Sequence, residues 1–222
     1  ATAGVLRELA QGQSFFDREI DVLVATHPDT DHIGGLVDVL GRYDVDIIIE
    51  TEAQSESPAA LAYAKAAALE GAEIKIAQAG QKIKLGASTT IEIYSPQGDT
   101  TNWENNSASV VFKLSYGEID FMLTGDAPSQ IEDYLVGAYG ADLESEVLKL
   151  GHHGSKTSTS EKFLDTVRPE YVVVSASSDN RYGHPHYSVM DRVFERNIKS
   201  YSTATDGTIT FETDGREVWV EK

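Results

Sequence analysis

The chain has 222 residues, of which 41% are hydrophobic, enough to bury one sizeable core. It contains no Cys, so disulfides are excluded and any metal must be held by His, Asp, Glu or Asn. The chain lacks a run of about 18 apolar residues, so we expect no membrane span in it. Its start lacks the basic and apolar regions of a signal peptide, so we expect no signal peptide there either. Localisation stays open.

Acidic residues outnumber basic ones by 36 to 18, which gives a net charge of −18. Such a chain repels polyanions on average. The balance differs locally, because residues 149–199 hold eight Lys or Arg against six Asp or Glu, together with four of the six His. We therefore expect any site for an anionic substrate in this segment; the alternative is a chance fluctuation of surface charge.

The first third of the chain alternates between helical and extended patterns. These patterns predict a weak helix, a strand, a helix, a strand and an Ala-rich helix at residues 5–11, 20–25, 33–43, 46–50 and 58–69. Pro58 suits the first turn of the last helix, and Gly71 ends it. Strands that alternate with helices favour a parallel sheet.

After residue 74 apolar and polar residues alternate with a period of two, which is typical of half-exposed strands. Strands are predicted at residues 81–85, 90–94, 110–114 and 119–123, with a hairpin turn at 115–118. The remaining elements are helices at 128–136, 158–167 and 189–197, strands at 147–150 and 171–175, and a β pair at 207–213 and 217–220. We expect one domain of α/β class over residues 1–222, an αββα sandwich of two mixed sheets flanked by helices.

The most informative segment is Thr26-His27-Pro28-Asp29-Thr30-Asp31-His32-Ile33-Gly34-Gly35, which follows the first predicted strand. It places two imidazoles and two carboxylates at a strand end, where a rigid scaffold holds side chains toward a common cleft. The segment predicts half of a binuclear metal site, and hence a hydrolase. The alternative is an Asx-rich turn that caps the next helix, which would need neither His.

Three further segments combine an apolar strand or a Gly with ionisable residues. They are residues 121–126, 148–156 and 180–186. Two ions need a bridging carboxylate, and Asp126 is well placed to bridge them. The expected metal ligands are His27, Asp29, Asp31, His32, Asp126 and His152, with His153 as the competing assignment for the last.

The remaining polar residues of these segments are candidates for substrate binding. They are Asn105, His153, Ser155, Lys156, His184 and His186. His184 and His186 would bind a phosphoryl or carboxylate oxygen or protonate a leaving group, and the alternative is that they are neutral packing residues. Lys156 is otherwise a surface lysine, and Asn105 otherwise a turn residue.

Taken together, the motifs resemble the metallo-β-lactamase superfamily, whose fold is the αββα sandwich. Within it they are most similar to the extracellular hydrolase domain of ComEC-type DNA-uptake proteins. The matching motifs are residues 26–35, Asn105-Asn106-Ser107, 123–127, 148–155 and 180–186. The resemblance implies a metal-activated hydroxide, oriented by Asp31, that attacks a phosphodiester such as single-stranded DNA. It also implies an extracellular-facing domain of a larger membrane protein.

Three departures from the family pattern affect this expectation. Asp29 replaces the second His of the first motif, as in the ComEC-like branch, and the His expected near Asn105 is absent, so an Asn oxygen or water would fill its place. Oxygen-rich ligand sets favour Mn²⁺ relative to Zn²⁺, so the two expected divalent ions are Zn or Mn, and a single ion is the alternative. Relatives begin with strands whose motif is not found here; without those strands the first sheet loses an edge.

Two other functions stay open. One is hydrolysis of a β-lactam or thioester, with Lys156 holding a substrate carboxylate. The other is a degenerate, non-catalytic metal-binding domain, which the missing His near Asn105 suggests. The net charge of −18 argues against tight binding of duplex DNA, so a small phosphodiester or a short single strand is an equally good candidate substrate.

Overall fold

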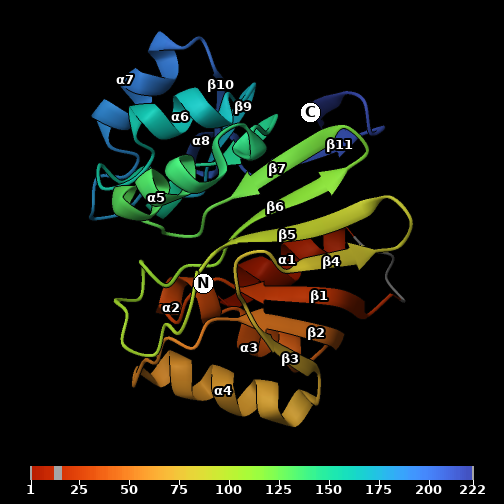
Figure 1. The fold of residues 1–222 in the computed structure, drawn as a ribbon. Helices are drawn as coiled ribbons and strands as arrows, with labels where there is room; N and C mark the ends of the chain where they lie inside the picture. The colour runs from red at the N-terminus through yellow and green to blue at the C-terminus, as the bar shows by residue number, and fades with distance from the viewer. Residues whose placement is uncertain (1, 13–16, 222) are drawn as a thin grey trace. The chain divides into compact units, whose positions relative to one another are not determined.

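The computed structural model describes residues 2–12 and 17–221, and the chain divides into two compact units (Figure 1). Residues 1–78 and 96–110 make up the first unit, and residues 79–95 and 111–222 the second. The expectation of one domain over the whole chain stays a prediction. None of the described helices is both long enough and apolar enough to cross a membrane.

The first unit is built on a parallel sheet of three strands in the order β1 (Glu19–Ala25), β2 (Asp44–Glu50) and β3 (Glu73–Ile76). Its helices are α1 (Thr2–Gly12), α2 (Thr30–Ile33), α3 (Leu36–Leu40) and α4 (Pro58–Glu70). Figure 1 shows α4 running along one face of this sheet. In the part of the chain that the structure describes, β1 pairs only with β2 and is an edge strand. The predicted parallel sheet is confirmed, and β3 was not predicted.

Local signals explain where the helices of the first unit begin and end. The side chain of Ser57 accepts a hydrogen bond from the backbone N–H of Ala60 at the start of α4, and Gly71 ends it with a φ of 90°. The single helix predicted over 33–43 is wrong, because α2 and α3 are separate helices on either side of Gly34 and Gly35. Two consecutive glycines disfavour a helix by about 1 kcal/mol each.

The second unit contains a seven-stranded sheet in the order β10-β9-β8-β7-β6-β5-β4 and a two-stranded sheet. The strands are β4 (Lys82–Leu85), β5 (Thr89–Ser95), β6 (Val111–Tyr116), β7 (Ile119–Leu123), β8 (Val147–Lys149), β9 (Tyr171–Val174), β10 (Lys199–Ser202), β11 (Thr210–Thr213) and β12 (Val218–Glu221). Strands β4 to β7 pair antiparallel and β7 to β10 parallel. This sheet is mixed as predicted, whereas the described sheet of the first unit is wholly parallel because helices join its strands.

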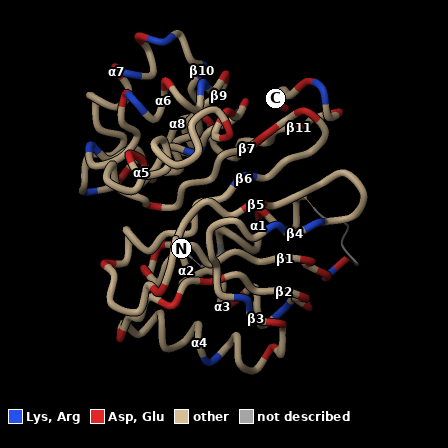
Figure 2. Tube along the Cα trace, viewed as in Figure 1, with Lys and Arg blue, Asp and Glu red and all other residues tan. Residues whose placement is uncertain are grey.

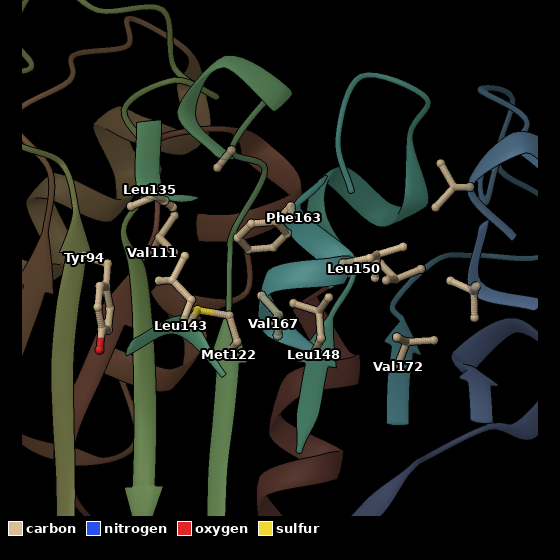
Figure 3. Close-up of a cluster of buried hydrophobic side chains, with 14 of the residues drawn as sticks. Tyr94, Val111, Met122, Leu135, Leu143, Leu148, Leu150, Phe163, Val167 and Val172 are labelled. Carbon is tan, nitrogen blue, oxygen red and sulfur yellow. The ribbon is translucent and has the colours of Figure 1, made fainter. Parts of the chain in front are cut away.

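Helices of the second unit pack on the large sheet around a common core. They are α5 (Ser129–Tyr139), α6 (Glu161–Val167) and α7 (Tyr187–Glu195). The short helix α8 (Thr203–Asp206) buries none of its residues, and two 3₁₀ turns are η1 (Gly140–Leu143) and η2 (Gly151–Gly154). Met122, Leu148 and Val172 lie side by side on adjacent strands and are fully buried beneath α5, α6 and α7 (Figure 3). In Figure 2 blue Lys and Arg segments recur around α6 and α7, within the segment of local positive balance.

Several elements of the second unit differ from the sequence prediction. Helix α6 begins at Glu161, three residues later than expected, because the Ser160 side chain caps it by accepting from the Phe163 N–H. Strand β10 and helix α8 were not predicted, since each has only four residues and carries no long apolar period.

We predict that Leu148→Ala lowers the free energy of unfolding by about 2–5 kcal/mol, because it opens a cavity in the middle of the large sheet. Leu148 is 0% exposed. The control is Leu61→Ala on α4, where the side chain is 62% exposed and the change should stay within about 0.5 kcal/mol. Urea unfolding measures both, and equal losses would contradict the assigned core.

Candidate metal centre

In the first unit, predicted site residues gather at the carboxyl end of β1. The rings of His27 and His32 lie with centroids 4.0 Å apart, and His27 is only 1% exposed. His27 Nε2 lies 3.7 Å from Asp29 Oδ2, and the Asn105 side-chain amide donates to Asp29 Oδ1 at 2.7 Å. We call His27, Asp29, His32 and Asn105 the first cluster. Asp31 lies in the same segment, in α2, and is exposed.

Thr26 orients both imidazoles of the first cluster. Its hydroxyl oxygen lies 3.1 Å from His27 Nδ1 and 3.2 Å from His32 Nδ1, and Ser109 Oγ lies 3.4 Å from His27 Nδ1. A hydroxyl oxygen can accept from two N–H groups, so both rings can carry their proton on Nδ1 and keep a lone pair on Nε2. Metal-binding imidazoles are oriented in this way by a hydrogen bond to their other nitrogen. The sequence prediction missed Thr26 and Ser109.

Asp29 occupies the position before the first turn of α2 but does not cap that helix with its side chain. Its carboxylate faces Asn105 and His27 instead. The alternative of an Asx-rich capping turn therefore fails for this residue. Asn105 is no mere turn residue either, since its amide holds Asp29, although the sequence predicted that it binds substrate or replaces a missing ligand.

In the second unit, a carboxylate and two imidazoles meet where β7 and β8 end. Asp126 is 3% exposed, and its Oδ2 lies 3.8 Å from His152 Nε2 and 3.6 Å from His153 Nε2. The ring of His184 lies 5.6 Å from that of His152. We call Asp126, His152, His153 and His184 the second cluster.

The donor set of the second cluster fits a cation. The distances from Nε2 of His152 and of His153 to Asp126 Oδ2 are both longer than a hydrogen bond. Two atoms bound to one ion at about 2.1 Å and a tetrahedral angle lie ~3.4 Å apart, close to the spacing observed. His153 Nδ1 lies 2.6 Å from the Ser175 carbonyl oxygen, to which it donates, so the lone pair of His153 stands on Nε2. His152 Nδ1 has the longer contact, 3.4 Å to Thr157 Oγ1.

The backbone at these two histidines is unusual. His152 and His153 have φ values of 48° and 56°, in the left-handed region that side chains other than Gly rarely adopt. Such conformations persist only where the surroundings hold them, and they cluster at functional sites. Here the His152 N–H donates to the Gly125 carbonyl oxygen beside Asp126, at 3.2 Å. This contact ties the histidine turn directly to the end of β7.

A neighbouring loop supports the turn. Gly154 has a φ of 79°, and a Cβ there would come within 2.7 Å of the Pro185 side chain. His184, one residue before Pro185, is held by Asn180, whose side-chain oxygen accepts the His184 N–H at 2.8 Å. The loop therefore presents His184 to the second cluster from a fixed position.

Three other predicted substrate-binding residues, His186, Ser155 and Lys156, follow His152 and His153 in the chain and differ in burial and contacts. His186 caps α7, since its Nδ1 accepts from the Ser188 N–H. Ser155 is buried and its hydroxyl contacts Thr157, whereas Lys156 is exposed. Their roles in substrate binding stay predictions.

We predict that His184 is neutral at pH 7 in the metal-free protein. Burial first, and then positive charge on His152 and His153, lower its pKa below the ordinary value of 6.5. The folded state thus opposes protonation of His184, and it loses stability as the pH falls below about 6.5. Titration by NMR should show a midpoint below 6.5 that rises in His152→Ala and moves less in His186→Ala. A wild-type midpoint at or above 6.5 would contradict this.

Comparison with known proteins agrees with the motifs. The sequence model of the metallo-beta-lactamase superfamily matches residues 3–178. ComE operon protein 3 of Bacillus subtilis is 30% identical over 90% of this chain and 25% of its own length. Competence protein ComA of Neisseria gonorrhoeae is 35% identical over 87% of this chain and 25% of its own length. The chain therefore spans about a quarter of the length of these relatives.

A solved structure shows the same fold. The metallo-beta-lactamase fold protein YhfI of Bacillus subtilis is 13% identical and aligns with a TM-score of 0.56 over 98% of this chain and 83% of that chain. The predicted fold class is confirmed, and so is the predicted resemblance to ComEC-type proteins. Since the family match covers most of its length, the chain belongs to the metallo-β-lactamase superfamily.

Proposed function

We propose that this chain is a metal-dependent hydrolase of phosphodiesters that uses two divalent ions. The ligands proposed are His27, Asp29, Asp31, His32, Asp126 and His152, with Asp126 as the bridge. The observation that carries the proposal is the single Thr26 hydroxyl beside Nδ1 of both His27 and His32. The match to the metallo-beta-lactamase superfamily over residues 3–178 supports a metal-dependent hydrolase.

When bound, the ions would supply Lewis acidity and would lower the pKa of a coordinated water toward neutrality. The residues of the chain would position and transfer protons around that water. Asp31 would accept a hydrogen bond from it and so orient it. Asn105 would hold the Asp29 carboxylate in place through the contact at 2.7 Å, as a positioning residue and not as a ligand.

The environment of His184 favours one of its two predicted roles. Burial and the neighbouring histidines lower its pKa, and bound cations would lower it further. A neutral imidazole is a poor proton donor to a leaving group, but its N–H is a good hydrogen-bond donor. We therefore assign His184 to holding a phosphoryl oxygen of the substrate.

The relatives support phosphodiesters as the substrate class. The names of two of them, Competence protein ComA and Recombination protein 2, refer to competence and recombination. Both processes act on DNA, and a single strand is the DNA form that the proposal favours. As the chain covers about a quarter of such relatives, its setting within a larger membrane protein is part of the proposal.

We expect the protein loaded with Mn²⁺ or Zn²⁺ to cleave bis-p-nitrophenyl phosphate and single-stranded DNA. Asp31→Ala and Asp126→Ala should each lower turnover by roughly 10²-fold or more, because each removes a proposed ligand. EDTA should abolish turnover and the added ion restore it. Turnover of nitrocefin alone would show a β-lactamase instead. Absence of bound metal, without rescue by either ion, would leave only a non-catalytic role.

The Thr26 contact gives a second test that needs no substrate. We expect Thr26→Val, which keeps the shape and removes the hydroxyl, to weaken metal binding by about 10–100-fold. Thr26→Ser keeps the hydroxyl and should retain the affinity. The control is Thr166→Val, which removes the exposed hydroxyl on α6 that bonds to Lys162. Competition with a chromophoric chelator measures the affinities, and an unchanged affinity in Thr26→Val would contradict the orienting role.

A further inference from the structure

The first unit contains a cavity of about 430 Å³ beside the carboxyl ends of β1 and β2. Its walls come from these strand ends, from the loop at residues 51–57 and from α4. Most of the lining is small and apolar, and includes Ala25, Pro28, Ile33, Ala60, Ala64 and Ala67. The volume and the apolar lining are those of sites that bind small molecules.

One carboxylate faces this apolar space. Glu50 ends β2, where its Cα pairs with that of Ala25 on β1, and it lines the cavity. Its Oε2 accepts a hydrogen bond from the Tyr63 hydroxyl at 2.8 Å. Among the residues that the structure describes, no hydrogen bond involves Oε1. Burial, followed by the charge of Glu50, raises the pKa of Tyr63, so the phenol remains a donor. The carboxylate therefore keeps capacity to accept from a ligand.

The cavity is continuous with the first cluster. His27 and Pro28 both line it, and His27 is also the buried imidazole beside Asp29. A group bound at the first cluster would thus have the cavity at its side. A ligand that fills both would combine an anionic part with a flat apolar part that offers hydrogen-bond donors.

We propose that the cavity binds a nucleobase with an exocyclic amino group, namely adenine, cytosine or guanine, next to the phosphate at the first cluster. The amino group would donate to Glu50, as amino groups of bases do to carboxylates, while the ring lies against the alanines. Thymine and uracil carry a carbonyl oxygen in place of that amino group, and this oxygen would face the carboxylate unfavourably. The inference rests on the proposed function, since it assigns the substrate class of the same site.

Such a pocket would supply affinity that does not depend on cationic side chains. The chain has a net charge of −18, and ionic contacts to phosphates are weak in such a protein. Contacts to the faces and edges of bases release no counterions, so their contribution does not depend on cationic side chains.

The test uses nucleosides and EDTA-treated protein, so that neither phosphate nor metal contributes. Titration followed by the NMR signals of the Ala60 and Ala67 amides should show saturable binding of deoxyadenosine, deoxycytidine and deoxyguanosine. Thymidine should bind about tenfold more weakly, the discrimination expected of a good base contact. Thymidine or indole binding as tightly as deoxyadenosine would reduce the site to an unspecific apolar cavity and overturn the proposal.

Matched variants locate the binding. Glu50→Gln should remove the preference for the three amino-bearing nucleosides over thymidine. Ala64→Leu should weaken the binding of all nucleosides about tenfold, because it narrows the cavity. The control is Ala68→Leu, an exposed position of α4 that does not line the cavity. Circular dichroism checks that each variant is folded. Equal effects of Ala64→Leu and Ala68→Leu, or an unchanged preference in Glu50→Gln, would overturn the proposal.

The two proposals fail in distinguishable ways. Selective nucleoside binding without any metal-dependent cleavage of phosphodiesters would refute the hydrolase and leave the pocket. Cleavage without selective nucleoside binding would refute the pocket and leave the hydrolase.

Discussion

The parallel pairing of β1 with β2 is the constraint on which the first cluster and the cavity both depend. Ala25 pairs with Glu50, so the two strands end side by side and the chain leaves β1 toward His27 next to the Glu50 carboxylate. The pairing of Leu23 with Ile48, both buried, holds this register. A slip of one residue would move the paired side chains to the opposite face of the sheet. The hydrophobic core thus sets the position of polar groups that do not belong to it.

Both clusters orient imidazoles with neutral partners. A hydroxyl serves His27 and His32 in the first cluster, and the carbonyl oxygen of Ser175 serves His153 in the second. Carboxylates would orient the rings as well, but they would add negative charge outside the ligand set. With neutral partners, the carboxylate of each cluster, Asp29 in the first and Asp126 in the second, keeps its negative charge for a cation bound within its own cluster. The left-handed backbone at His152 and His153 is the local cost of bringing two adjacent imidazoles to one carboxylate.

The elements that could be predicted from sequence are those with a strong local signal. Strands β1 and β2 are apolar runs, and Ser57, Pro58 and Gly71 mark the ends of α4. Strand β3 escaped prediction because it has four mostly exposed residues that gain order only by pairing with β2. The ligand candidates stood out because imidazoles and carboxylates at strand ends are rare. Their partners could not be found in this way: Ser109 lies 82 residues from His27, and a Ser in an irregular segment carries no signal of that contact.

The acidic charge of the chain and the proposed phosphodiester substrate constrain each other. An anionic protein gains little from phosphate contacts alone, so binding must come from groups that are not cationic side chains. Divalent ions would provide positive charge only at the reacting phosphate, and the proposed base pocket would provide affinity next to it. On the proposed function, a duplex is disfavoured twice, because its phosphates are more numerous and its base edges are already paired. Single strands expose the amino groups from which Glu50 would accept hydrogen bonds. The net charge of the chain and the cavity therefore favour the same form of substrate.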